Sequence, residues 1–349
     1  MRLVTNVIDP AELTAFVREL DFAEFTLNQF LPDQVRPTVE WAFDRRDQRR
    51  EDMASYRAFD VEAEIGSRPS MERIRGAIPP LSRKLLLGEE QRLRLNQLAN
   101  GGGQTGPSAE MINAAFDDAA FATESILSRI EYARGQVLST GKVTFTNDEG
   151  FVAAEIDYGI PGAHFTSVST AWATSGSATP IADMRAKVDD YMTRNKGRRP
   201  AVALTSSTAI SNALLTAEAR AYAGVGGTIP SILTPAQLRD IFVAHDLPPL
   251  VAYDTQVSIG GVDTRVIPVD KVIFLPQANS QRFGETTFGV TAESLDLVGA
   301  GYLNVDTAPG LTGVVLKSDD PVQHWTKVSG IAVPVLKDNK AITVLDVAP

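Results

Sequence analysis

The stretch from Ser108 to Leu138 limits the possible folds more than any other part of the chain. Positions on one predicted helix face recur every three or four residues along it, namely Ile112, Phe116, Ala119, Thr123, Ile126, Ile130, Ala133 and Val137. Pro107 and Ser108 mark the start of this helix, and Gly141 marks its end. At 1.5 Å per residue, such a helix is about 45 Å long. The rest of the chain must therefore be arranged along it.

The charges in this predicted helix follow the helix dipole. Acidic residues lie early in the stretch, whereas Arg129 and Arg134 lie late. Two interpretations fit the pattern at this point. In the first, the stretch is an ordinary long core helix or half of a coiled coil. In the second, it is a spine laid across a thin, plate-like protein.

The composition excludes several classes of function. The chain has 33 basic and 43 acidic residues and a net charge of −10, whereas a general nucleic-acid-binding protein needs a basic surface. It has no cysteine, which excludes disulfides and thiolate metal sites. The first residues lack the apolar run of a signal peptide, and no stretch approaches the roughly 20 apolar residues of a membrane span. We therefore expect a soluble protein made inside a cell.

The N-terminal region combines a capped helix with an apolar arm. Asp9 followed by Pro10 and Glu12 predicts a helix that runs to Leu20. The following residues, up to Pro32, are apolar without a clean period and include Phe25 and Phe30. We expect an extended arm whose aromatic side chains rest on something else, such as another subunit.

Two half-buried strands are predicted next, at residues 39–43 and 59–65, because apolar and polar residues alternate there. Trp41, Phe43 and Phe59 lie on their apolar faces. The segment between them carries four arginines and four acids, the arginines being Arg45, Arg46, Arg49 and Arg50. Because the two signs balance, a solvated hairpin end or a surface that meets complementary charges is favoured over a nucleic-acid patch.

Residues 66–83 are predicted to be an irregular connector and residues 85–98 a second helix. The glycine-rich loop at residues 101–108 lacks the lysine and the preceding strand of a phosphate loop, so we interpret it as a hinge. After the long helix, residues 142–146 and 151–156 predict a hairpin, and residues 157–180 a long surface connection.

An α/β pattern begins at Pro180. It predicts helices at residues 181–194, from Ser206 or Ser207 to 221, and at 235–245, where Thr234 opens a capping box. Strands are predicted at residues 201–204, 250–253, 257–259, 262–267 and 272–275. The remaining residues return to strands, at 287–291, 314–317, 325–329, 331–336 and 341–347.

No group of residues predicts a reaction. The three histidines, His164, His245 and His324, lie far apart in the sequence and lack the spacing of metal ligands. There is no G-x-S-x-G elbow and no dinucleotide-binding glycine pattern. We predict no catalytic residue, no metal site and no cofactor.

The order of these parts resembles the major capsid proteins of tailed bacteriophages, with the Hong Kong ninety-seven-type fold, and is most similar to the lambda-type capsid protein E family. The local resemblance lies in Leu13–Pro32, in Gly141–Thr146 continuing to Glu155–Gly159, and in Trp325–Val328 followed by Ala332–Leu336. It covers nearly the whole chain, and the order of the parts carries it more than any single motif.

The resemblance implies an α+β fold in five parts. These are an N-terminal arm (1–35) that reaches along an adjacent subunit, an extended hairpin loop (36–66) that lies over a neighbour, a peripheral domain (67–179) with the spine helix (108–138), an axial α/β domain (180–285), and a β return to the peripheral domain (286–349). No cross-linking lysine and asparagine pair and no cleaved N-terminal scaffolding region can be placed in the sequence.

The implied function is structural and not enzymatic. The resemblance implies a virion shell subunit, assembled in the host bacterial cytoplasm, that forms pentamers and hexamers of an icosahedral capsid around double-stranded DNA without sequence-specific binding. Its implied partners are further copies of itself, a scaffolding protein, the portal and a decoration protein, with no membrane. The expected inter-subunit contacts are Phe25, Phe30, Trp41, Phe43, Arg45, Arg46, Arg49, Arg50 and Phe59.

Two alternatives stay open on the sequence alone. The first is an encapsulin-like compartment shell, which shares the fold class but holds a cargo enzyme. The second is an enzyme whose α/β part, residues 180–280, binds a small ligand at the strand ends.

Overall fold

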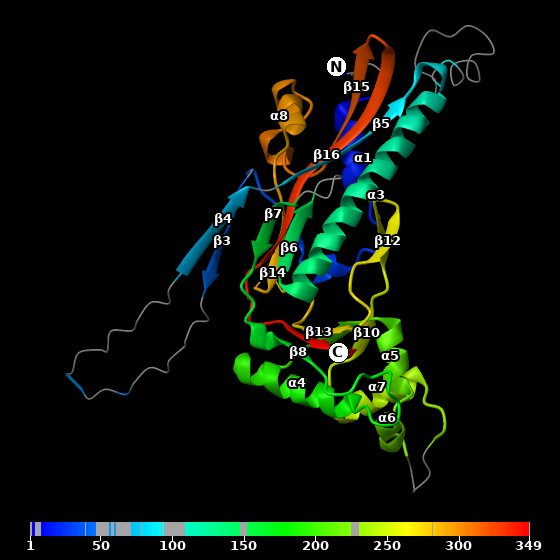
Figure 1. The fold of residues 1–349 in the computed structure, drawn as a ribbon. Coiled ribbons are helices and arrows are strands. Elements are labelled where there is room, and N and C mark those ends of the chain that lie inside the picture. The colour runs from blue at the N-terminus through cyan, green and yellow to red at the C-terminus, as the bar shows by residue number, and fades with distance from the viewer. Residues whose placement is uncertain are drawn as a thin grey trace.

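The computed structural model shows a long helix that joins two sheets into one elongated plate, with a hairpin standing off to one side (Figure 1). It describes residues 2–3, 8–38, 40–46, 56, 59–60, 71–77, 79–91, 93, 109–146, 152–224, 230–280 and 282–348.

The long helix, α3, spans Ala109–Thr140 and confirms the prediction of a spine. Its buried face includes Ala119, Ile126 and Val137, and it packs along two strands of the larger sheet. Gly141 ends the helix with a φ of +72°, a conformation that favours glycine. The charged residues Glu131 and Arg134 are buried with this face, which the apolar spacing alone does not predict.

The larger sheet has six strands and lies beside α3. The strand β16 (Val322–Leu336) is its centre and replaces the two predicted strands at 325–329 and 331–336. Its first half pairs with β15 (Thr312–Asp319) and β5 (Pro80–Leu87), and its second half pairs with β14 (Gly284–Phe288). The edges are formed by β1 (Arg2–Leu3) and β2 (Asp33–Val35).

The N-terminal helix, α1, spans Pro10–Glu19, as its capping residues predict. Asp9 accepts the backbone N–H of Ala11 at 2.9 Å. The buried side chains of Leu13 and Val17 rest on Gly313 of β15. Three short elements complete this part, namely the 3₁₀ turns η1 (Leu27–Gln29) and η3 (Val305–Thr307) and the helix α8 (Ala292–Gly299).

The smaller sheet has five strands and carries the C-terminus. Its order is β10 (Leu250–Ala252), β9 (Val202–Thr205), β13 (Lys271–Leu275), β17 (Thr343–Asp346) and β8 (Phe165–Ser167). Helices pack with it around a second core that contains Trp172, Met184 and Phe274. They are α4 (Pro180–Arg194), α5 (Ser207–Leu214), α6 (Ala217–Tyr222) and α7 (Pro235–Ala244). The 3₁₀ turn η2 spans Gly162–His164.

Three two-stranded hairpins complete the fold. They are β3 (Glu40–Arg46) with β4 (Met71–Ala77), β6 (Lys142–Thr146) with β7 (Val152–Asp157), and β11 (Gln256–Ile259) with β12 (Val262–Arg265). The last two confirm the predicted hairpins, although the turn at 147–150 lies outside the described residues.

The region between the first hairpin and the long helix corrects the sequence predictions. The strand that pairs with β3 is β4 and not residues 59–65, of which only 59–60 are described, in a turn. The predicted connector 66–83 therefore contains β4 and the start of β5. The predicted helix 85–98 begins within β5, because eight residues of that strand pair with β16. This long-range pairing overrides the local helix preference of the leucines. The glycine loop at 101–108 lies outside the described residues.

The boundaries of the predicted axial and peripheral parts are also corrected. The predicted connection 157–180 contributes β8, and the predicted peripheral return 286–349 contributes β17, so both supply strands to the smaller sheet. The helix predicted up to residue 221 is interrupted at Leu215, where Thr216 caps a new helix. The helix α8 was not predicted. These differences arise because strand pairing between distant segments leaves little local signal.

The N-terminal arm packs on its own chain. The parallel strand β2 pairs with β14, and Leu27 and Leu31 are fully buried in the central core. Residues 8–35 therefore have much of their packing within their own chain, and their reach along an adjacent subunit stays a prediction. The apolar arm has its partners in the strands and helix that close over it.

Replacing Gly135 by alanine tests the contact between α3 and Val266, the residue that follows β12. A Cβ on Gly135 would lie 2.3 Å from the carbonyl oxygen of Val266 and 2.5 Å from its Cγ1. We expect Gly135→Ala to lower the free energy of unfolding by about 1–3 kcal/mol, because overpacking outweighs the usual helix gain. Urea denaturation of the subunit measures this. Gly299→Ala is the control, since no atom lies within 4 Å of its Cβ position. Equal effects of the two changes would contradict the expectation.

Candidate functional site

The described residues contain no cluster of three or more His, Asp or Glu side chains that could hold a metal. His164 is buried, and its Nδ1 lies 2.6 Å from the carbonyl oxygen of Ile342. Burial lowers the pKa of His164. His245 ends α7 and packs edge-on against Tyr222, while His324 lies in β16. The three histidines therefore lie in separate parts of the structure and form no common site.

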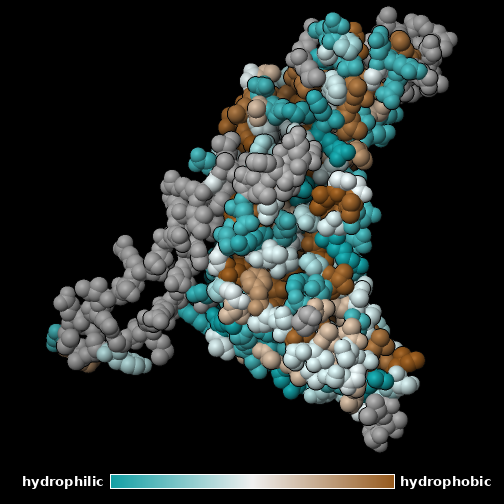
Figure 2. All heavy atoms as spheres, in the orientation of Figure 1, coloured by the Kyte–Doolittle hydropathy of each residue, from teal (hydrophilic) through white to brown (hydrophobic). Residues whose placement is uncertain are grey.

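The surface offers no membrane-crossing element in the part of the chain that is described, because none of its helices is both long and apolar enough. On the face drawn in Figure 2, hydrophobic residues form separate patches among hydrophilic ones. These hydrophobic patches are candidate contact surfaces.

The predicted inter-subunit residues of the arm lie against the chain itself. Phe30 is only 5% exposed and belongs to the central core. Phe25 is half-buried, packs against the same core and contacts Phe22 at a ring distance of 5.8 Å. Phe30 is therefore covered by its own chain in this structure, and its contact with another subunit stays a prediction. Its neighbours along the chain fill a core that closes locally.

The predicted residues of the hairpin loop are described only in part. Trp41, Phe43, Arg45 and Arg46 belong to β3, whose backbone is described, and Phe59 is 98% exposed. Arg49 and Arg50 lie outside the described residues. The ribbon of β3 and β4 projects from the side of the plate in Figure 1. A two-stranded hairpin alone is at best marginally stable in water, so this ribbon needs a covering surface.

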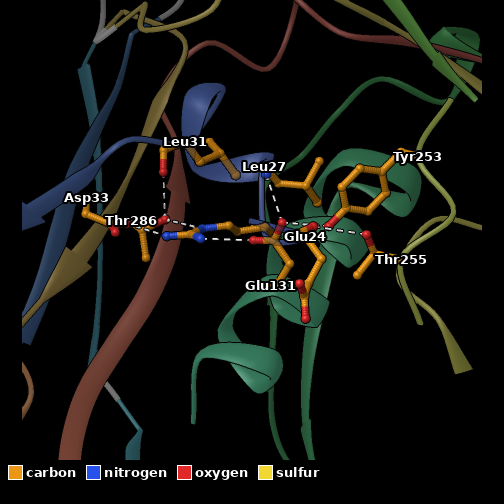
Figure 3. Close-up of polar contacts among 9 residues, drawn as sticks. Glu24, Leu27, Leu31, Asp33, Glu131, Tyr253, Thr255 and Thr286 are labelled. Carbon is orange, nitrogen blue, oxygen red and sulfur yellow. Dashed lines mark hydrogen bonds and ion pairs between the residues drawn. The ribbon is translucent and has the colours of Figure 1, made fainter. Parts of the chain in front are cut away.

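A buried polar junction on α3 holds the arm against both sheets (Figure 3). Glu131 is fully buried. Its carboxylate accepts the backbone N–H of Leu27 at 2.8 Å and the hydroxyl of Tyr253 at 2.6 Å. The Nη1 of Arg134, one turn along the helix, donates to the other Glu131 oxygen at 3.0 Å. The ion pair is thus completed by the arm and by the residue that follows β10.

Arg134 extends the junction toward the larger sheet. Its Nε donates to the hydroxyl oxygen of Thr286 in β14 at 2.9 Å, and its Nη2 pairs with Asp33 in β2. The Thr286 hydroxyl in turn donates to the carbonyl oxygen of Leu31 at 2.9 Å. A second tie lies beside it, where the Thr255 hydroxyl donates to the carbonyl oxygen of Glu24 at 3.0 Å.

The electrostatics of the junction reflect its burial. Burial raises the pKa of Asp33, although the guanidinium of Arg134 acts in the opposite direction. Burial and the neighbouring Glu131 carboxylate raise the pKa of Tyr253 well above its usual value, so the phenol stays protonated and donates. A buried ion pair is stable only when its remaining donors and acceptors are satisfied. Here the arm supplies Leu27 and Asp33 to the network.

The sequence analysis missed this junction. Glu131 and Arg134 are three residues apart beside the predicted apolar face, and an acidic residue late in a helix opposes the helix dipole. The unfavourable position of Glu131 was the feature of the sequence that pointed to a buried partner. Nothing local to these two residues, however, points to Thr286 or Tyr253.

Replacing Arg134 tests the junction. Arg134→Met leaves the buried Glu131 without its cation, so we expect the free energy of unfolding to fall by about 3–5 kcal/mol. Arg199→Met is the control, because the Arg199 side chain is 49% exposed and its pair with Asp246 spans 4.0 Å; we expect a change within about 1 kcal/mol. Urea denaturation measures both. Combining Glu131→Gln with Arg134→Met should recover part of the loss, and similar values for Arg134→Met and Arg199→Met would refute the role of the junction.

Solved structures resemble this fold over nearly their whole length. A prophage protein of E. coli CFT073 assigned as a capsid protein aligns with a TM-score of 0.63 and 14% identity, covering 98% of this chain and 99% of that one. A phage-related protein from Bordetella bronchiseptica RB50 aligns with a TM-score of 0.55 and 13% identity, covering 98% of each. At these identities the likeness concerns the fold. The curated proteins include no match to the sequence.

A comparison of the sequence with protein-family models identifies the family of this chain. The family model described as phage major capsid protein E matches residues 9–342, which leaves only short terminal segments outside it. It includes the arm from residue 9, the buried junction and every described strand except β1 and β17. The chain belongs to the phage major capsid protein E family.

Proposed function

We propose that this chain is a structural, non-enzymatic shell subunit that self-assembles into the icosahedral capsid of a bacteriophage around double-stranded DNA. The observation that carries the proposal is the family match over residues 9–342 together with a spine helix that joins both sheets into a plate. Copies of a plate-like subunit, placed edge to edge, can form a thin wall. The family match favours this reading over an encapsulin-like compartment and over a ligand-binding enzyme.

The hairpin of β3 and β4 is the element best placed to hold neighbouring copies together. It projects from the plate, and its sequence supplies Trp41, Phe43, Arg45 and Arg46. Arg49, Arg50 and Phe59 continue this loop in the sequence. A ribbon of one copy that lies on the next copy makes a heterologous contact, and such contacts close into rings when the rotation allows. Pentamers and hexamers are such rings.

The part around the smaller sheet would meet its copies near the symmetry axes. It exposes apolar side chains on its helices and in the loop before α7, including Leu215, Val243 and Ile232. Exposed apolar groups in a compact domain are candidates for burial by another subunit. Half-buried Phe25, at the edge of the arm, would add a smaller contact.

The partners follow from the role of a shell. We include a scaffolding protein, the portal and a decoration protein among them, with assembly in the host bacterial cytoplasm and the finished subunit in the virion. The enclosed DNA would be held without sequence-specific contacts, which suits a chain of net charge −10.

Microscopy of the expressed chain tests assembly directly. We expect negative-stain images and light scattering to show closed shells, or rings of subunits, for the chain alone or with a scaffolding protein from the same gene cluster. A chain that stays monomeric in both preparations would refute the proposed function. Particles that contain phage DNA after packaging, rather than a cargo enzyme, separate a capsid from a compartment shell.

Charge reversal in the hairpin tests the contact between copies. We expect Arg45→Glu with Arg46→Glu to abolish or strongly reduce assembly, because the loop loses its complementarity to the neighbour, while the unfolding midpoint of the subunit stays unchanged. The control is Arg45→Lys with Arg46→Lys, which keeps the charge and should assemble. Normal shells from the reversed variant would rule out these arginines as contacts. Sedimentation velocity measures the assembled fraction.

A further inference from the structure

A pocket of about 420 Å³ lies beside the N-terminal arm, where α1, α3 and the edge strand β2 of the larger sheet meet. Its large apolar side chains are those of Leu20, Phe22, Phe25, Leu127, Phe288 and Leu311. The rings of Phe22 and Phe25 lie 5.8 Å apart and form part of its wall. An apolar pocket of this size at the surface can receive side chains of a ligand or of another protein.

The charged residues of this pocket favour a cation over an anion as part of its occupant. Both of its own cations are engaged within the chain. Arg134 belongs to the buried junction, and Arg18 donates to backbone carbonyl oxygens, among them that of Thr307 at 2.7 Å. Asp21 and Asp306 also line the pocket, are exposed, and form no ion pair within the described part of the chain. Their carboxylates can therefore accept a cationic side chain from outside.

The loop between β3 and β4 carries side chains of the matching kind. Tyr56 and Phe59 are both fully exposed, so nothing in the described part of their own chain covers these two rings. In the sequence, Arg57 stands between them and is the only charged residue among positions 53–59. Tyrosine, arginine and other aromatic residues are concentrated at the centres of protein–protein contacts. Two aromatic anchors with one cation fit an apolar pocket that carries two exposed carboxylates.

A second pocket, of about 500 Å³, fits the same loop less well. It lies between β5, the middle of α3 and β11, and its lining includes Arg83, Lys84 and Arg129 but no acidic residue and no phenylalanine. Three cations would repel Arg57. The pocket beside the arm is therefore the better receiver for the loop.

The pocket beside the arm lies near the base of the hairpin of its own chain. Val35 of β2 lines it, and the chain continues from there into β3 at Glu40. The strands β3 and β4 pair over seven residues, up to Arg46 with Met71, which is about 20 Å of ribbon. This ribbon projects from the plate (Figure 1) and carries the loop away from the pocket at its own base. The pocket of another copy is the one that the loop can meet.

We propose that this pocket of one copy receives Tyr56 and Phe59 of a neighbouring copy, and that Arg57 of the neighbour pairs with Asp21 or Asp306. The inference rests on the proposed function and names the surface on which the hairpin loop would lie. Because the pocket and the loop are different parts of the subunit, the contact is heterologous, and each copy gives one loop and receives one. Repetition of this contact links the copies around a ring.

Cysteine cross-linking of the assembled full chain tests this pairing, because the chain has no cysteine of its own. Ala58→Cys with Val35→Cys places one thiol in the loop and one in the pocket and keeps both aromatic anchors. After treatment with a short bismaleimide, we expect a denaturing gel to show dimers and higher multiples of the chain, since each copy gives and receives. The matched control is Ala58→Cys with Val262→Cys, which should run as single chains. Val262 lies in β12, outside the pocket, and is 66% exposed against 63% for Val35.

The strength of assembly gives an independent measurement. We expect Phe59→Ala to raise the chain concentration at which half of the copies assemble by about thirtyfold, the value for one lost anchor contact per copy. Val35→Lys should act in the same direction, because it places a charge in the apolar pocket. Val262→Lys adds the same charge elsewhere, and we expect a change of about twofold or less. Both Phe59 and Val35 are exposed in the subunit, so the midpoint of thermal unfolding should stay unchanged. Light scattering measures the assembled fraction.

The possible outcomes separate this inference from the proposed function. Normal shells of the Ala58→Cys, Val35→Cys variant without linked chains would overturn the pairing alone, and so would cross-links that stay within one chain. Assembly that is blocked by Val35→Lys but insensitive to Phe59→Ala would assign the pocket to another occupant and overturn the role of the loop. Equal effects of Val35→Lys and Val262→Lys would overturn the role of the pocket. Failure of the unaltered chain to assemble, alone or with a scaffolding protein, would refute the shell and this inference with it.

Discussion

The buried pair of Glu131 and Arg134 is the interaction on which the arrangement of this molecule depends. Two charges in the middle of a helix are costly to remove from water unless every donor and acceptor finds a partner. Those partners are four residues from three other parts of the chain, namely Leu27 and Asp33 in the arm, Thr286 in β14, and Tyr253 after β10. The hydrogen bonds of this buried pair are therefore complete only when the arm and both sheets are in place. The stability of the helix is thus coupled to the rest of the fold.

The apolar core reinforces this coupling. The central cluster contains Leu27 and Leu31 from the arm, Val137 and Leu138 from α3, and residues of both sheets. Close packing at the end of the helix needs Gly135, where the carbonyl of Val266 occupies the space that a side chain would take. A plate held in this way has few independent parts. The hairpin of β3 and β4, by contrast, projects from this body. A projecting hairpin agrees with a subunit whose function depends on contacts with its copies.

Ion pairs between separate elements add to this coupling. Lys271 of β13 pairs with Asp346 of β17, Lys327 of β16 pairs with Glu293 of α8, and Lys337 pairs with Glu285 of β14.

The sequence by itself determined the long helix, its end at Gly141, the capped helices α1 and α7, and the hairpins of β6–β7 and β11–β12, because each has a local pattern of period, cap or turn. It also determined the family resemblance through the order of these parts. The tertiary structure decided that residues 80–87 form a strand, that β8 and β17 join the smaller sheet, and that Phe30 is buried by its own chain. It also decided the partners of Glu131 and Arg134. These features depend on pairing between segments far apart in sequence, and such pairing is set by long-range hydrogen bonds and burial that no local pattern records.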